Sequence, residues 1–346
     1  MTTRKIMGRD TMAQLVKLQD YISRYQIDLA RYPTQFIRLK KGQWDRVKYQ
    51  WQSGSAIQRW EHIETGEEEI VEKPKFTFLR KFFPPRSVKE AEVEPEEEDI
   101  ESVDVTNELI GDDYFPEEET TLNFEPNMVY NPKTFEELKK VFIDQFFHFQ
   151  MKWASSTLRE KSYVDPKYMR DTLLRAMLQT LPDNYLIFYY PILRVKKAPI
   201  ELDILIMTPT ECICITVLEQ EDQAVFVGNS ERFWMKKVGK NEKKLLNPMI
   251  QLSRMETIVA QLFAQEGVEI PIKKVLLTRN GYIDYPGAAY GVQFVDKRKF
   301  PEWMQHLKKT ASPMKHMQIR AAQTILKTVQ TTSFNRDIWN VEKKEG

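Results

Sequence analysis

The densest group of residues able to do chemistry is a cluster of basic side chains between positions 232 and 244. Six positive charges fall within these thirteen residues, and Glu242 alone opposes them. A cluster of this density could contact several phosphates of a nucleic acid, with an affinity that falls as salt rises. The same composition is typical of a solvated hairpin that binds nothing. The basic residues are Arg232, Lys236, Lys237, Lys240, Lys243 and Lys244.

A second basic stretch, residues 36–60, alternates basic residues with aromatic ones. Cations that pair with phosphates, next to rings that stack on bases, are typical of proteins that bind single-stranded nucleic acid. An amphipathic helical region with its aromatic residues in the core gives the same pattern, so both interpretations stay open. The candidate phosphate-binding residues here are Arg38, Lys40, Lys41, Arg46 and Lys48.

The sequence gives little support to zinc, nucleotide or disulfide chemistry. Cys212 and Cys214 lie one residue apart in an apolar run, and the four histidines are scattered, which disfavours a disulfide framework and a zinc site. No glycine-rich phosphate-binding motif follows an expected strand. We therefore expect no metal and no cofactor.

The start of the chain and its apolar runs bear on location. The first ten residues contain no apolar stretch of the signal-peptide type. The longest apolar run, residues 185–193, is too short to cross a bilayer. We expect a cytoplasmic protein with no membrane partner.

The net charge of +1 conceals two basic blocks around an acidic belt. Residues 91–125 contain 15 acidic residues and no basic one. Because residues 90–126 lack hydrophobic periodicity and exceed the usual loop length, we expect a disordered linker there. It is either a spacer or a mimic of nucleic acid that covers a basic surface of the same chain.

The elements that must position these residues can be read from apolar periodicity. Apolar residues at three- and four-residue steps predict a helix over 10–29 that Pro33 ends, and residues 1–89 as a whole form a basic, aromatic-rich and mainly helical region. Beyond the linker, helices are predicted over 135–153, 165–181, 247–267, 301–309 and 313–331. Strands are predicted over 185–190, 200–207, 212–218, 224–227, 272–277 and 291–295. This order predicts an α/β domain over 127–331, a sheet flanked by helices, followed by a polar tail over 332–346.

A specific resemblance lies in residues 200–251. The features that carry it are, in order, Glu201-Leu202-Asp203 before an apolar strand, a turn at Thr208-Pro209, a second apolar strand, Trp234 after a short hairpin, and Asn247-Pro248 with Gln251 at the start of a helix. Over about residues 165–310 the chain resembles the nuclease-related domain (NERD), a member of the PD-(D/E)xK restriction-endonuclease-like superfamily. The resemblance implies a restriction-endonuclease-like central mixed sheet flanked by helices.

The resemblance also implies where a cleavage site would lie. In that family, an acidic residue at the Asp203 position and a Glu-x-Lys triplet on the next strand form the site. Carboxylates there hold Mg²⁺, and a cation offsets the charge that develops on the phosphate. Thirteen residues after Asp203 this chain has Thr216-Val217-Leu218. Thr216 and Leu218 thus stand at the positions of the lost glutamate and lysine, and only Asp203 matches.

Three functions follow, and we favour the first. It is a nuclease-related protein without catalytic activity that binds nucleic acid through its two basic stretches. The second is a Mg²⁺-dependent nuclease whose catalytic groups have moved, and Mg²⁺ is expected as a cofactor only in this case. The third is a scaffold that docks a protein partner, whose identity stays open, through its aromatic N-terminal region. The groups that could have taken over the chemistry are Asp171, Lys196, Lys197, Glu219 and Glu221.

Overall fold

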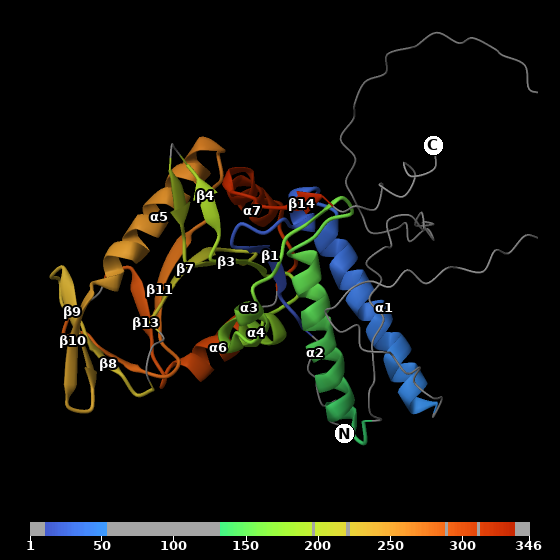
Figure 1. Cartoon of the computed structure of the whole chain (residues 1–346), viewed down its shortest axis with the longest axis horizontal. Helices are drawn as coiled ribbons and strands as arrows, with labels where there is room; N and C mark the ends of the chain where they lie inside the picture. Colours follow the sequence, from blue (N-terminus) through green and yellow to red (C-terminus); the bar gives the residue numbers. More distant parts are fainter. Residues whose placement is uncertain are drawn as a thin grey trace, which may run out of the picture. The chain divides into compact units, whose positions relative to one another are not determined.

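The structure, a computed structural model, describes residues 11–53, 132–195, 198–218, 222–287, 290–309 and 312–335 (Figure 1). All of them belong to one unit of the chain, formed by residues 1–60 together with 121–346. The acidic linker expected over 90–126 lies outside the described residues.

The helices and strands of the described residues have the following bounds. The helices are the 3-10 helix η1 (Arg24–Gln26), α1 (Tyr32–Gln52), α2 (Phe135–Trp153), α3 (Pro166–Met169), α4 (Thr172–Thr180), α5 (Pro248–Gln265), α6 (Phe300–Lys309) and α7 (His316–Thr328). The strands are β1 (Gln14–Leu18), β2 (Glu160–Lys161), β3 (Leu186–Tyr189), β4 (Ile192–Arg194), β5 (Pro199–Glu201), β6 (Ile204–Met207), β7 (Cys212–Val217), β8 (Val225–Val227), β9 (Phe233–Val238), β10 (Asn241–Leu246), β11 (Ile272–Leu277), β12 (Tyr282–Asp284), β13 (Val292–Val295) and β14 (Phe334–Asn335).

A mixed sheet of six strands, in the order β1-β3-β6-β7-β11-β13, forms the centre of this unit. β6 runs antiparallel to β3 and β7, and every other neighbouring pair is parallel. Nearly all residues of β3, β6 and β7 are buried, as in strands covered on both faces. Figure 1 shows α5 and α7 on one side of the sheet and α4 and α6 on the other. The expected α/β sandwich with a mixed sheet and a helical N-terminal segment, α1, is confirmed.

The helix expected over residues 10–29 is wrong. Gln14–Leu18 forms the edge strand β1, parallel to β3, and only Arg24–Gln26 is helical. All five residues of β1 are buried, so the strand lacks the alternating pattern that would have identified it. Pro33 does not end a helix but lies in the first turn of α1, where proline's missing N–H costs nothing.

Other elements differ from the prediction in detail. The helix expected over 165–181 is split into α3 and α4, because the Asp171 carboxylate caps a new helix by accepting hydrogen bonds from the N–H groups of Leu173 (2.9 Å) and Leu174 (3.0 Å). The strand expected over 200–207 is interrupted at Leu202 and Asp203, which separates β5 from β6. β12, which pairs with β8 in a second sheet of order β10-β9-β8-β12, has no counterpart in the prediction.

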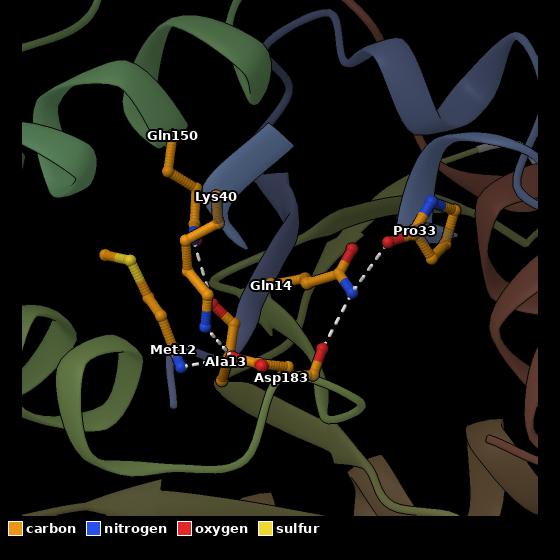
Figure 2. A network of polar contacts seen from close by, with 7 residues as sticks. All are labelled: Met12, Ala13, Gln14, Pro33, Lys40, Gln150 and Asp183. Atoms are coloured by element: carbon orange, nitrogen blue, oxygen red, sulfur yellow. Dashed lines mark hydrogen bonds and ion pairs between the residues drawn. The ribbon is translucent and has the colours of Figure 1, made fainter. Parts of the chain in front are cut away.

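The outer edge of β1 is closed by a side chain rather than by another strand (Figure 2). The buried Gln150 amide on α2 donates from Nε2 to the carbonyl oxygen of Ala13 (2.9 Å) and accepts at Oε1 from the N–H of Leu15 (2.7 Å). Backbone groups of a buried edge strand need such partners, because an unpaired buried N–H or C=O is costly. Gln150 therefore fastens α2 to the sheet.

A second set of contacts in Figure 2 centres on Asp183, in the turn before β3. Its carboxylate accepts from the N–H of Met12 (2.5 Å) and from the ammonium group of Lys40 on α1. Its backbone carbonyl accepts from Nε2 of Gln14 (2.7 Å), which also donates to the carbonyl of Pro33 (3.3 Å). These bonds join α1 to the start of β1.

The far end of β1 is tied to the segment that follows α7. The buried Lys17 ammonium donates to the carbonyl oxygen of Tyr21 (2.6 Å), to Oε1 of Gln26 (2.9 Å) and to the hydroxyl of Thr331 (3.1 Å). Burial lowers the pKa of Lys17 to about 7, against the opposing effect of the Asp20 charge. The first residues of the expected tail at 332–346 also pair, since β14 joins β2.

Candidate functional site

The carboxyl ends of β1, β3, β7 and β11 lie at one edge of the central sheet, and β6 begins there. Asp203 immediately precedes β6. The register that pairs Ile204 with Ile215 places Asp203 opposite Thr216 on β7. Ligands of α/β sheets bind outside the carboxyl ends of the strands, so this edge is the candidate site.

The Asp203 carboxyl lies in a poorly solvated position. Burial raises the pKa of Asp203, the Thr216 hydroxyl lowers it, and the negative charge of Glu201 raises it again, with a net upward shift. The Thr216 hydroxyl is itself buried and makes no hydrogen bond of regular geometry with the described residues. The edge thus holds a carboxyl displaced toward its neutral form.

The two positions that the family resemblance assigns to glutamate and lysine are occupied by buried residues. Thr216 is 6% exposed and Leu218 is 7% exposed. The Leu218 side chain belongs to the hydrophobic core, and its N–H donates to the carbonyl of Leu277 (2.8 Å). Neither side chain carries a carboxylate or an ammonium group. Lys196, Lys197, Glu219 and Glu221 lie outside the described residues.

Asp171, considered above as a further carboxylate, already has partners on both oxygens. Oδ1 accepts the two N–H groups at the start of α4, and Oδ2 accepts the hydroxyl of Tyr189 (2.6 Å). Within the described ranges, no group of three or more histidine, cysteine, aspartate or glutamate side chains is arranged to hold a metal ion. These residues do not fit a metal site built like that of the family.

Sequence reasoning missed a group of tyrosines at the same edge. Tyr189 ends β3 and Tyr190 follows it, with their rings edge to face at 4.8 Å. Tyr168 on α3 packs edge-on against Tyr189 at 6.3 Å. Tyr190 has a left-handed φ of 49° and donates its N–H to the carbonyl of Asp203 (2.8 Å). Two consecutive tyrosines at the end of an apolar strand were the available signal.

The basic cluster at 232–244 lies on a β-hairpin formed by β9 and β10. Five of its cations are exposed: Arg232, Lys237, Lys240, Lys243 and Lys244. Lys237 is exposed but pairs with Glu242 (2.8 Å), and Lys236 is buried. Figure 1 draws the hairpin well apart from α3 and α4. The hairpin and the Asp203 edge are therefore separate features.

The basic residues of the N-terminal stretch fall into two groups. Arg38, Lys41 and Arg46 are exposed on α1. Lys40 is 3% exposed and pairs with Asp183, so it supports the fold instead of facing a ligand. Lys48 is half-buried, with its ammonium 5.7 Å from the centre of the Phe135 ring. The aromatic residues Phe36 and Trp44 belong to the core.

The remaining motif residues organise the start of α5. The Asn247 side chain caps α5 by accepting the N–H of Met249 (3.0 Å) and donates to the carbonyl of Glu231 (2.7 Å). Trp234 is buried and donates from Nε1 to the carbonyl of Asn229 (3.0 Å). Pro248 is buried and opens α5, and Gln251 is half-buried on it. Among the described residues, no helix has the length and apolar character to cross a membrane.

Comparison with known proteins agrees with the resemblance drawn from these residues. Residues 169–278 match the family model of the nuclease-related domain, NERD, which confirms the resemblance. An RNA 2′,3′-cyclic phosphodiesterase from Geobacillus stearothermophilus is 52% identical over 42 residues. That match covers 12% of this chain and 13% of the length of the curated relative. No solved structure matches the chain.

Proposed function

We propose that this nuclease-related chain binds nucleic acid without cleaving it. The proposal rests on the residues beside Asp203, because Thr216 and Leu218 occupy the positions of the acid and the cation that the family uses. Metal-assisted hydrolysis needs carboxylate ligands and a group that stabilises charge on the phosphate. Loss of one preorganised charge-stabilising donor costs about 10²–10³ in rate, and here two groups are replaced.

The exposed cations of the β9–β10 hairpin support a role in binding. Arg232, Lys240, Lys243 and Lys244 present four positive charges with no ion pair among the described residues. Beside them Phe233 is 48% exposed, and the Arg232 guanidinium lies 5.6 Å from the centre of its ring. Exposed cations next to an accessible ring suit phosphates and stacked bases.

Replacing three hairpin lysines tests the proposal directly. The variant carries Lys240→Ser, Lys243→Ser and Lys244→Ser, and the matched control carries Lys299→Ser, Lys308→Ser and Lys309→Ser, which are also exposed. Each phosphate contact contributes about 0.7–0.9 to the slope of log affinity against log salt. Fluorescence anisotropy with labelled DNA and RNA should show a slope shallower by about 2–3 for the hairpin variant and little change for the control. No binding at low salt, or equal loss in both variants, would contradict the proposal.

A cleavage assay separates this proposal from a nuclease with relocated groups. The wild-type chain is incubated with single- and double-stranded DNA and RNA in Mg²⁺ or Mn²⁺. We expect binding and no cleavage. Cleavage that disappears in Asp203→Ala would show that the chain is a nuclease with moved catalytic groups.

A further inference from the structure

An open pocket lies beside the Asp203 edge, where β1 and β3 end. Its volume is about 390 Å³, within the range of about 300–1,000 Å³ that small-molecule sites occupy. Its walls come from the turn after β1, from α3 and the cap of α4, from the turn after β3, and from β5. The lining residues are Gln19, Lys167, Tyr168, Asp171, Tyr190 and Glu201.

The pocket offers hydrogen-bond acceptors rather than a phosphate site. Glu201 is exposed, and its carboxylate makes no hydrogen bond or ion pair within the described residues. Asp171 is fixed by its helix cap and by Tyr189. Two negative charges repel a phosphate and attract a ligand edge that donates hydrogen bonds.

Tyr190 supplies aromatic surface in the same pocket, whereas Tyr168 is only 3% exposed. The half-buried Tyr190 lines the pocket together with Tyr168. Both rings are held edge to face against Tyr189. Tyr190 and Gln19 also share left-handed backbone angles, with φ of 49° and 42°, a conformation that costs free energy in residues other than glycine. Because the Tyr190 ring is held against Tyr189, it loses little side-chain entropy when a planar ligand stacks on it.

One cation, Lys167, lines the pocket, and a second, Arg279, lies near the start of α4. Lys167 has a side chain that is 61% exposed, and its ammonium lies 3.1 Å from the Asp165 carboxylate. Arg279 donates from Nη2 to the hydroxyl of Thr172 (3.1 Å), at the start of α4. A ligand with a neutral planar part and flanking phosphates matches this distribution of charge. An unpaired nucleotide in a nucleic-acid strand is such a ligand.

We propose that the pocket binds one unpaired guanine base of a single-stranded nucleic acid, stacked against Tyr190, with its Watson–Crick edge donating to Glu201. Guanine carries two adjacent donors, N1–H and the N2 amino group, that one carboxylate can accept together. Adenine and cytosine offer a single amino group there, and uracil or thymine places carbonyl oxygens beside its one N–H. The Gln19 amide can donate to guanine O6. This inference rests on the proposed function and specifies its ligand.

The test uses labelled five-nucleotide DNAs that differ only in the central base within a thymine background, titrated against the full chain. The wild type should bind the guanine oligonucleotide best. Glu201→Gln should weaken that complex by about 10-fold or more and leave the all-thymine oligonucleotide unchanged. Tyr190→Ala should weaken the binding of every oligonucleotide by roughly 10-fold, because any base in the pocket stacks on this ring. Glu269→Gln, an exposed change on another surface, is the matched control.

The outcomes separate failure of the pocket from failure of nucleic-acid binding. Equal binding of all central bases, or an effect of Glu201→Gln that does not depend on the base, overturns the guanine pocket and leaves nucleic-acid binding intact. If no oligonucleotide binds even at low salt, the proposed function fails, and titration with GMP and AMP decides the pocket. GMP binding that Glu201→Gln abolishes supports it, and no GMP binding overturns it. Mn²⁺ binding that depends on Glu201 without base preference also overturns it.

Discussion

At the scale of single residues, Asp203 is held in a position that costs free energy. Its carboxyl is half-buried beside Glu201, and the nearby Thr216 hydroxyl gives it no regular hydrogen bond. A buried carboxyl without a cation is destabilising in its ionised form.

The raised pKa of Asp203 sets the sign of its effect on stability. The folded state binds the proton more tightly than the unfolded chain, so stability falls as pH rises from the unfolded pKa through the folded pKa. Asp203→Asn should therefore raise the melting temperature at pH 7, by roughly 2–4 °C for each kcal/mol recovered. Its melting temperature should match that of the wild type at pH 3.

Calorimetry of both proteins between pH 3 and pH 8 measures this difference. Asp222→Asn serves as the control, because Asp222 is exposed. A lower melting temperature for Asp203→Asn at pH 7 would show that the ionised carboxylate is stabilised in the fold, contrary to this account.

At the scale of elements, most helices and strands after residue 132 follow from periodicity and caps. The Asn247-Pro248 pair fixes the start of α5, and apolar runs identify β6, β7 and β11. β1 could not be predicted in this way, because its strand state depends on pairing with β3, about 170 residues later. The tyrosines near Asp203 were missed for the same reason, since α3 and β3 meet only in the folded chain.

Gln150 should be essential to the attachment of β1. Gln150→Leu keeps a similar size but leaves the Leu15 N–H and the Ala13 carbonyl buried without partners. Each such group costs about 1–3 kcal/mol, so the free energy of unfolding should fall by roughly 2–6 kcal/mol. Urea unfolding gives this value.

A surface glutamine provides the control for that measurement. Gln261→Leu changes an exposed residue of α5 and should alter the free energy of unfolding by less than about 0.5 kcal/mol. If Gln150→Leu changes the free energy of unfolding as little as this control does, the hydrogen bonds of the Gln150 amide to β1 do not stabilise the fold.

At the scale of the whole molecule, charge is divided between segments. Residues 91–125 carry 15 acidic residues and no basic one, while exposed cations stand on α1 and on the β9–β10 hairpin. Opposite charges on one chain attract each other, so we expect the acidic residues to compete with a nucleic acid for these cations.

Deleting residues 91–120, which lie outside the described residues, tests that competition. If the acidic belt covers a basic surface, the shortened chain should bind nucleic acid more tightly than the full chain, and the difference should shrink as salt rises. Anisotropy titrations at two salt concentrations measure it. Unchanged affinity would reduce the belt to a spacer.

The placement of β1 has a practical consequence for anyone who works with this gene. The stretch that matches the nuclease-related family, residues 169–278, leaves out β1, α2 and α7. Expressed alone, this fragment would expose the edge of β3 that β1 covers in the full chain. Unpaired edge strands of this kind promote aggregation. We therefore expect this fragment to form inclusion bodies. A fragment that also contains β1 and Thr331 keeps the hydrogen bond between Lys17 and Thr331, which joins the two ends of the fold.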